Sequence, residues 1–407
     1  MGPLKPMPQP SRVRATVAYF TRARGKGLHI SPFHADKLCI KLKPTINRRI
    51  FALPNRNLIM KWTPLASVFP VLVTALVASS FSTAAENGAD KDMQAVLDAH
   101  ASLKPKPIET LSPAEARKQP TLADAVNMVL KKQGKSTDPE TLVPGVKSAD
   151  RSIAGAVGQI PARIYTPSGA GPFPVIVYYH GGGWVIGDKQ VYDGGARGLA
   201  KQANAVVVSV DYRLAPEHKF SASWDDALAA YKWTLTNAAS INGDPKKLAL
   251  AGESAGGNLA VATAIAVRDA GLQAPLHVLA VYPVSQTSTT TESYEKHANA
   301  KPLNRPMIKW FVDKLINSPS DLKDPRIQLI DAKLKDLPSV TIINASIDPL
   351  LSEGVMLEDA LKKAGMPVER KMYSGVTHEF FGMAAVVQKA KEAQEYAGKR
   401  LKQAFGG

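Results

Sequence analysis

The stretch LALAGESAGGNLA, Leu248 to Ala260, decides the fold. An apolar run leads into Gly252 and Ser254, and a segment rich in alanine and glycine follows. The pattern G-x-S-x-G between a buried strand and a helix is typical of a sharp turn that exposes the serine hydroxyl. The positions two before and two after the serine need almost no side chain, and Gly252 and Gly256 meet this requirement. We therefore interpret Ser254 as a candidate nucleophile.

The chain around this stretch alternates between apolar runs and helical segments. Five runs are nearly continuous, which is typical of strands covered on both faces: 174–180, 205–212, 247–252, 276–283 and 339–346. A mixed sixth run lies at 367–373, and the alternating stretch 160–167 is predicted as an edge strand. Helical segments are predicted at 223–240, 255–270, 353–364 and 384–404. This order predicts an α/β protein with a mostly parallel, doubly wound sheet. Such sheets place active sites at the carboxyl ends of their strands.

A serine hydroxyl needs a base that takes its proton before it becomes a good nucleophile. In proteins that carry a nucleophilic serine on such a strand-to-helix turn, the order along the chain is serine, then an acid, then histidine. Three histidines follow the serine: His277 lies in a predicted strand, His297 in a polar insertion, and His378 between the last strand and the last helix. His378 is therefore the predicted base.

The orienting acid is predicted to be Asp348, which follows the apolar run 339–346 in the loop SIDPL. It would hold the histidine tautomer and stabilise the imidazolium. Asp331, Asp336 and Glu353 are the alternatives. Glu253 is not a candidate for this acid, because a direct neighbour of the serine on a tight turn points away from the base. Its carboxylate is expected to brace the turn.

A glycine run, YYHGGGWVIGD at 178–188, follows the first covered strand. Three consecutive glycines let backbone N–H groups approach a developing oxyanion closely. The expected donors are the amides of Gly181, Gly182 and Ala255. His180 has no second ligand at a useful spacing, so we expect it to fix the loop by hydrogen bonding and predict no metal site.

Two segments lie outside the alternating core. Residues 86–135 contain helical patterns, including a capping box at Ser112. The interval 286–335 is too long for a simple crossover and contains an apolar helical face that includes Trp310. This helix either packs into the core or covers the site as a lid together with the N-terminal helices. Residues 136–407, with that insertion, form the predicted catalytic domain.

The N-terminal part of the chain differs in composition from the rest. Residues 1–61 contain 13 lysines and arginines but only one acidic residue, so most of the net charge of +16 lies there. No basic stripe interleaved with aromatic residues follows, which argues against nucleic-acid binding. The only cysteine, Cys39, also lies in this part, which excludes disulfides and cysteine nucleophiles from the remainder.

Residues 60–85 have the pattern of a Sec-type signal peptide: a short cationic start, an apolar stretch and small residues at the cleavage site. The apolar stretch is short for a membrane span, so we prefer cleavage to a retained anchor. Residues 1–59 are expected to be an unstructured leader or upstream extension, with a twin-arginine signal and an organellar transit segment as alternatives. We therefore expect a periplasmic or secreted protein without a stable membrane span.

Five motifs together identify a family resemblance: HGGGW, DYRLAPEHKFSASWDDA, GESAGGNLA, SIDPLLSEG and YSGVTHEFF. They resemble the landmarks of the hormone-sensitive-lipase-like esterases (bacterial family IV), which have the α/β-hydrolase fold. The resemblance covers about residues 90–405. It implies hydrolysis of carboxylic esters with short or medium acyl chains under a two-part cap, without metal or cofactor. It also implies that Ser254, Asp348 and His378 are catalytic, and it raises a homodimer as an expectation.

Three residues depart from the common pattern of this family. Glu253 stands where aspartate is frequent, and Trp184 where phenylalanine is common. Glu379 follows the predicted base where glycine is usual, so its carboxylate either stabilises the imidazolium or faces solvent. Trp184 and Trp310 are expected to shape the substrate pocket. An amidase, lactonase or peptidase on the same residues, a triglyceride lipase and a ligand-binding protein are the alternative functions.

Overall fold

The computed structural model describes residues 88–407, and its centre is one eight-stranded sheet in the order β1-β2-β4-β3-β5-β6-β7-β8. The strands β1 and β2 pair antiparallel, β2 also pairs antiparallel with β4, and all other neighbours are parallel. The bounds of the strands are β1 Val146–Ala154, β2 Gln159–Pro167, β3 Phe173–Tyr179, β4 Val206–Val210, β5 Gly243–Glu253, β6 His277–Val281, β7 Ser339–Ile347 and β8 Val368–Thr377. The predicted α/β class is therefore confirmed.

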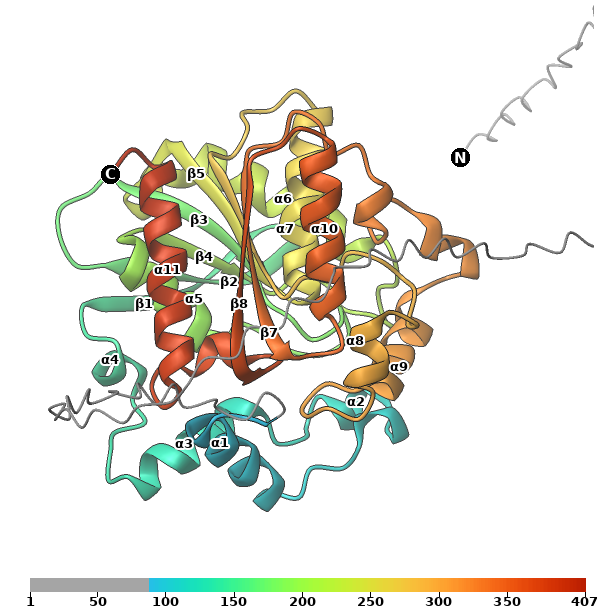
Figure 1. Cartoon of the computed structure of the whole chain (residues 1–407). Helices are drawn as coiled ribbons and strands as arrows, with labels where there is room; N and C mark the ends of the chain where they lie inside the picture. Colours follow the sequence, from blue (N-terminus) through green and yellow to red (C-terminus); the bar gives the residue numbers. More distant parts are fainter. Residues whose placement is uncertain (1–87) are drawn as a thin grey trace, which may run out of the picture. The chain divides into compact units, whose positions relative to one another are not determined.

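Helices cover both faces of the sheet (Figure 1). On one face α5 (Asp193–Ala203) and α11 (Gln388–Ala404) pack onto the strands through small apolar side chains. The other face is covered by α6 (Ala222–Asn237), α7 (Ala255–Asp269) and α10 (Leu351–Lys363). This double covering explains why the central strands are apolar at nearly every position.

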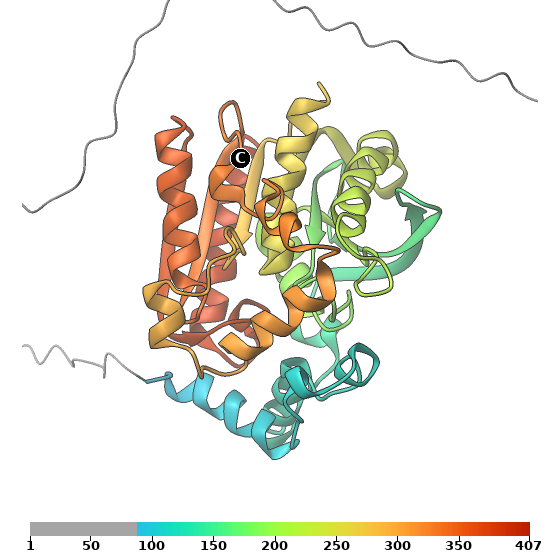
Figure 2. The same cartoon turned by 90° about the vertical axis from the view of Figure 1, so that its right-hand side faces the viewer.

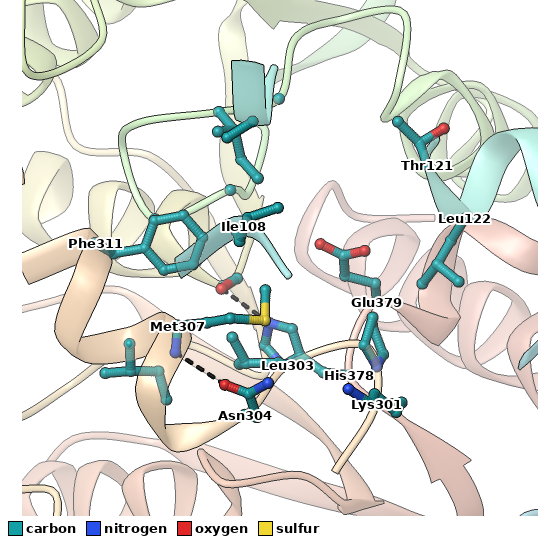
Figure 3. A pocket seen from close by; sticks show the side chains of 18 of the residues that line it. Ile108, Thr121, Leu122, Lys301, Leu303, Asn304, Met307, Phe311, His378 and Glu379 are labelled. Atoms are coloured by element: carbon teal, nitrogen blue, oxygen red, sulfur yellow. Dashed lines mark hydrogen bonds between the residues drawn. The ribbon is translucent and has the colours of Figure 1, made fainter. Parts of the chain in front are cut away.

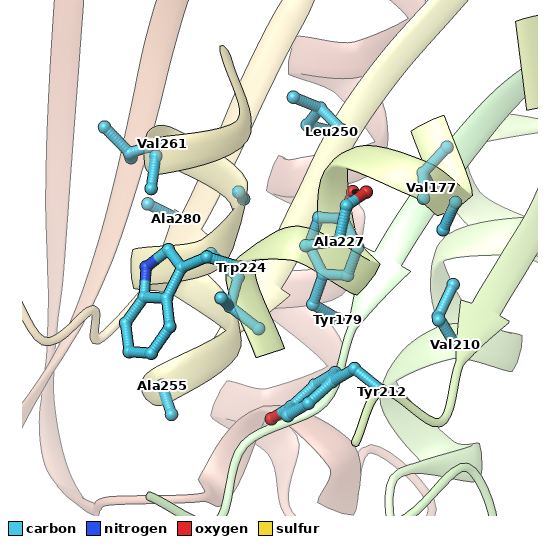
Figure 4. Packing of buried hydrophobic residues seen from close by; sticks show 14 of the residues in the cluster. Val177, Tyr179, Val210, Tyr212, Trp224, Ala227, Leu250, Ala255, Val261 and Ala280 are labelled. Atoms are coloured by element: carbon cyan, nitrogen blue, oxygen red, sulfur yellow. Dashed lines mark hydrogen bonds between the residues drawn. The ribbon is translucent and has the colours of Figure 1, made fainter. Parts of the chain in front are cut away.

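The hydrophobic core beneath α6 and α7 packs against both β5 and α7, the strand and the helix on either side of Ser254. Figure 4 shows Val177 and Leu250 of neighbouring strands beside Trp224 of α6 and Val261 of α7. These residues are at most 5% exposed. Burial of apolar surface contributes roughly 25 cal/mol per Å², so this packing holds the end of β5 and the start of α7 in fixed positions.

A cap lies at one end of the sheet and is built from two segments (Figure 2). The first contains α1 (Lys91–Ser102), α2 (Pro113–Ala116) and α3 (Leu122–Lys132). The second contains α8 (Glu292–Lys296) and α9 (Arg305–Leu315). The remaining helices are α4 (Pro139–Leu142) and short 3₁₀ turns at Ile108–Thr110, Ala238–Ile241, Pro319–Lys323, Leu329–Asp331 and Phe380–Met383.

Several details of the sequence-based prediction need correction. The stretch predicted as an edge strand is β2, which lies one position inside the sheet because the polar strand β1 forms the edge. The helix α5 was not predicted at all. The signal peptide, the basic leader and Cys39 lie outside residues 88–407, so those predictions remain untested. Within residues 88–407 no helix is long and apolar enough to cross a membrane.

Candidate active site

Ser254 sits on a strained turn between β5 and α7, as the G-x-S-x-G pattern predicts. Its φ is 56° and its ψ is −118°, a conformation that side-chain-bearing residues rarely adopt. The turn is compact because a Cβ on Gly256 would lie only 2.0 Å from the carbonyl oxygen of Tyr179 on β3. The Ser254 amide donates to the carbonyl of Val281 at 2.8 Å, which ties the turn to β6. The residue types of the motif thus follow from the space available.

The structure brings Ser254, His378 and Asp348 together in one chain of hydrogen bonds. His378 Nε2 lies 2.9 Å from Ser254 Oγ, and His378 Nδ1 lies 2.7 Å from Asp348 Oδ2. All three side chains are buried. The Leu350 amide donates to the other Asp348 oxygen at 2.8 Å, which fixes the carboxylate. These three residues come from loops after β5, β8 and β7, at the carboxyl ends of parallel strands.

The electrostatics of His378 favour the protonated imidazole. Burial is the largest single effect and lowers the pKa of His378, but the surrounding carboxylates together raise that pKa above its ordinary value, chiefly through the charge and hydrogen bond of Asp348. Glu379 and Glu253 contribute in the same direction. A histidine in this environment can accept a proton from Ser254 and hold it beside Asp348.

The other candidates for the base and the acid have hydrogen-bond partners that do not include Ser254. His277 lies between Ser339 and Thr341 on β7, and burial lowers its pKa to about 4. Glu353 accepts hydrogen bonds from the Ser285 amide and the Tyr294 hydroxyl, and burial raises its pKa to about 7. Neither contacts Ser254. Of the acids considered, Asp348 is the one hydrogen-bonded to His378.

The glycine loop after β3 lies beside the serine turn. The N–H groups of Gly181, Gly182 and Ala255 donate no hydrogen bond to any of residues 88–407. Gly182 has a φ of 96°, and a Cβ there would lie 2.2 Å from the carbonyl oxygen of Ile186, so the loop can take this shape only with glycine. Free amides at this place can donate hydrogen bonds to a negatively charged oxygen.

His180 holds the glycine loop through stacking and hydrogen bonding. Its ring lies stacked on Tyr212, with centroids 4.3 Å apart, and its Nδ1 is 2.8 Å from the Gly181 carbonyl oxygen. The Tyr212 hydroxyl donates to the His180 carbonyl at 2.8 Å. Residues 88–407 contain no group of His, Cys, Asp and Glu side chains suited to a metal ion.

A cavity of about 1090 Å³ opens onto Ser254 and His378 between the catalytic core and the cap. Figure 3 shows Ile108 of the first cap segment facing Met307 and Phe311 of α9 across this cavity. The α9 helix therefore covers the site as well as packing into the core, so both interpretations of that segment apply. The lining is mostly apolar, which suits a hydrophobic organic substrate.

Only one of the two tryptophans predicted to shape the pocket lines it. Trp184 does so, and its ring stacks on Trp224 with centroids 5.0 Å apart. Trp310 is not among the lining residues. Its Nε1 donates to the Leu111 carbonyl at 3.1 Å, so the indole joins the two cap segments, and its neighbour Phe311 faces the cavity.

Glu253 braces the serine turn, as its position suggested. It is 1% exposed, and its two carboxylate oxygens accept hydrogen bonds from the Tyr178 and Tyr282 hydroxyls. The Tyr282 ring in turn packs on His378, with centroids 4.5 Å apart. Burial raises the pKa of the Glu253 carboxyl to about 7, against the two hydrogen bonds that lower it. Sequence reasoning missed both tyrosines, since neither occupies a recognisable motif position.

Glu379 faces the cavity. It is partly buried, has a φ of 66°, and accepts a hydrogen bond at 3.0 Å from the Tyr192 hydroxyl through Oε1. Tyr192 Oη lies against Gly181, so this pair connects the loop after β8 with the glycine loop. The left-handed backbone explains why glycine is the residue expected here.

The first cap segment is fastened to the core at two places, at its start and directly after α2. At its start, Asp90 pairs with Lys389 at 2.6 Å, and the Asp90 amide donates to the Gly375 carbonyl at 2.7 Å. Further along, directly after α2, Arg117 contacts both carboxylate oxygens of Glu217, at 2.9 and 2.8 Å. Arg117 also donates to two backbone carbonyls, those of Val185 and Ala215.

Comparison with known proteins agrees with this architecture. A family model described as alpha/beta hydrolase fold matches residues 176–382. Carboxylesterase NlhH of Mycobacterium tuberculosis is 36% identical over 291 residues, which cover 70% of this chain and 91% of that protein. Ethyl acetate hydrolase of Pseudomonas putida is 30% identical, over 73% of this chain and 92% of that protein.

Solved esterase structures have the same fold. A hyperthermophilic esterase from the archaeon Pyrobaculum calidifontis matches with a TM-score of 0.66 and 34% identity, over 72% of this chain and 94% of that one. A thermostable esterase from Pseudomonas putida matches with a TM-score of 0.69 and 31% identity, over 78% and 98%. The chain belongs to the alpha/beta hydrolase family, in its hormone-sensitive-lipase-like group. It is a carboxylic ester hydrolase.

Proposed function

We propose that the protein hydrolyses short to medium acyl-chain esters through an acyl-enzyme on Ser254. The observation that carries the proposal is the continuous hydrogen-bond chain from Ser254 Oγ through His378 to Asp348, with distances of 2.9 and 2.7 Å. Both distances are within the reach that a nucleophile and its base require. The esterase names of the relatives support the choice of substrate.

In the first half of the reaction, Ser254 Oγ attacks the ester carbonyl carbon while His378 Nε2 takes the hydroxyl proton. The carbonyl oxygen becomes an oxyanion, which the amides of Gly181, Gly182 and Ala255 stabilise by hydrogen bonding. His378 then donates its proton to the alcohol oxygen as the carbon–oxygen bond breaks. Asp348 stabilises the imidazolium and keeps the ring in the required orientation.

In the second half, His378 takes a proton from water, and the resulting nucleophile attacks the acyl carbon bound to Ser254. The oxyanion forms again at the same amides, and its collapse releases the carboxylic acid. His378 returns the proton to Ser254 Oγ, so the enzyme is regenerated.

The decisive experiment measures p-nitrophenyl butyrate hydrolysis by wild type, Ser254→Ala and Asp348→Asn. We expect a loss of kcat/KM of roughly 10⁴-fold or more for both variants, because the residues act as one unit. Asp331→Asn is the matched control, since Asp331 is an acid in the same part of the chain, and it should keep its activity. Equal hydrolysis by Ser254→Ala and wild type would disprove the mechanism and favour a protein that only binds ligands.

An acyl-length series on wild type tests the substrate range. We expect the highest kcat/KM for p-nitrophenyl esters with four to eight acyl carbons, about the length that a cavity of about 1090 Å³ shared with the alcohol group accommodates. A maximum at twelve carbons or longer would instead indicate a lipase.

A further inference from the structure

Three carboxylates lie around His378. Glu253 and Asp348 lie close to His378, and both have their oxygens occupied, by two tyrosine hydroxyls and by His378 with the Leu350 amide respectively. Glu379 is the third, and it alone of the three lines the cavity. The charge nearest to a bound substrate on this wall therefore belongs to Glu379.

Glu379 has a free oxygen. Oε1 accepts the hydrogen bond from Tyr192, whereas Oε2 accepts none from residues 88–407. No lysine, arginine or histidine in the described part of the chain forms an ion pair with this carboxylate. In Figure 3 the carboxylate projects into the space between Leu122 and Ile108, above His378. A charge with an open oxygen thus faces the substrate space.

The arginine that lines the same cavity is paired with a carboxylate, and the lysines that line it are exposed to solvent. Arg117 is paired with Glu217. Lys104, Lys106 and Lys301 are exposed, so solvent and salt screen their charges. Partly buried Glu379 is screened less. The cavity as a whole is not acidic, but its wall at the reacting histidine is.

The alcohol part of a bound ester lies on this side. In the proposed mechanism His378 Nε2 delivers its proton to the alcohol oxygen, so the alcohol group must lie next to His378. Glu379 is the following residue, and the Tyr192 hydroxyl holds its carboxylate in position. A positively charged group on the alcohol would meet the free Oε2.

We propose that Glu379 is a specificity-determining residue that binds a cationic nitrogen in the alcohol part of the ester. The inference rests on the proposed function, because it places the alcohol by the role of His378. The substrates it favours are esters of amino alcohols, in preference to uncharged esters of the same shape. The reaction remains ordinary ester hydrolysis and needs no further reactant.

The test compares two esters of nearly identical shape, butyrylcholine and 3,3-dimethylbutyl butyrate, in which a carbon replaces the charged nitrogen. The readout is the ratio of their kcat/KM values in a pH-stat assay at neutral pH. We expect wild type to favour the cationic ester by about tenfold, a ratio suited to one partly screened ion pair. The difference should lie mainly in KM.

In Glu379→Gln and Glu379→Gly the ratio should fall to about one, since both variants lose the charge. The glycine variant also fits the left-handed backbone, so it controls for strain at this position. Asp98→Asn is the matched control for charge: it removes an exposed carboxylate from the lining of the same cavity, and the ratio should stay at its wild-type value. Because each ratio is taken within one variant, a general loss of activity cancels.

Two results would overturn the inference: a wild-type ratio of about one, or an unchanged ratio in Glu379→Gln. Failure of the proposed function looks different, because Ser254→Ala would then still hydrolyse both esters. The two failures can therefore be separated within one set of measurements.

Discussion

At Glu253, burial and hydrogen bonding act in opposite directions, and burial prevails. The raised pKa of about 7 means that the folded protein holds the proton more tightly than the unfolded chain, whose glutamates titrate near 4.5. Glu253 therefore contributes stability at pH values below 4.5, and that contribution is lost as the pH rises through 7. The hydrogen bonds from Tyr178 and Tyr282 act against this effect, because they favour the charged carboxylate.

Replacing Glu253 with glutamine should remove this dependence. We expect the free energy of unfolding of Glu253→Gln, minus that of wild type, to increase between pH 5 and pH 8 by up to about 3 kcal/mol, because wild type loses stability over this range. Urea unfolding at several pH values measures it. Glu140→Gln, at an exposed position, should show a constant difference from wild type. A flat difference for Glu253→Gln as well would mean that the buried carboxyl titrates normally.

The three residues of the hydrogen-bond chain could be predicted from the sequence more readily than the residues that surround them. Ser254, Asp348 and His378 could be predicted as neighbours because the order of the strands brings their loops to one edge of the sheet. Tyr178, Tyr282 and Tyr192 could not, since contacts between side chains from separate elements leave no periodic signal. The prediction that Trp310 shapes the pocket was wrong for the same reason: its indole and the Phe311 ring are adjacent in sequence but face different partners.

At the scale of elements, the apolar runs identified the central strands because those strands are buried on both faces. The edge strand β1 escaped prediction, since its solvated face carries polar residues at most positions. The helix α5 escaped because DGGARGLAKQA contains three glycines and only one large apolar side chain. It forms because it packs closely against α11 and the sheet, which is tertiary information.

Arg117, directly after the short helix α2, supplies the polar attachment of this part of the cap to the core. Arg117 supplies two hydrogen bonds to Glu217 and two to backbone carbonyls. The variant Arg117→Ala should therefore loosen this part of the cap and lower kcat/KM by roughly tenfold. Glu217→Gln keeps the carbonyl contacts and should cost less, about twofold, because the pair is largely exposed. Equal effects of the two changes would place the attachment in the ion pair alone.

At the scale of the whole molecule, both hydrophobic cores, the cavity and the Ser254–His378–Asp348 chain lie within residues 88–407. A chain shortened to these residues should therefore fold and keep kcat/KM for p-nitrophenyl butyrate within about twofold of the full-length value. Circular dichroism and the activity assay on both chains measure this. A shortened chain that is folded but inactive would show that the preceding residues take part in catalysis.

The attachment of the first cap segment at two places limits the width of the substrates that can enter the cavity. A cap segment attached at one place can rotate away from the cavity, whereas a segment attached at two places can move only a little. Widening the opening then requires breaking either the Asp90–Lys389 contact or the contacts of Arg117. We therefore expect slender, flexible esters to be accepted and bulky polymeric ones to be excluded before they reach Ser254.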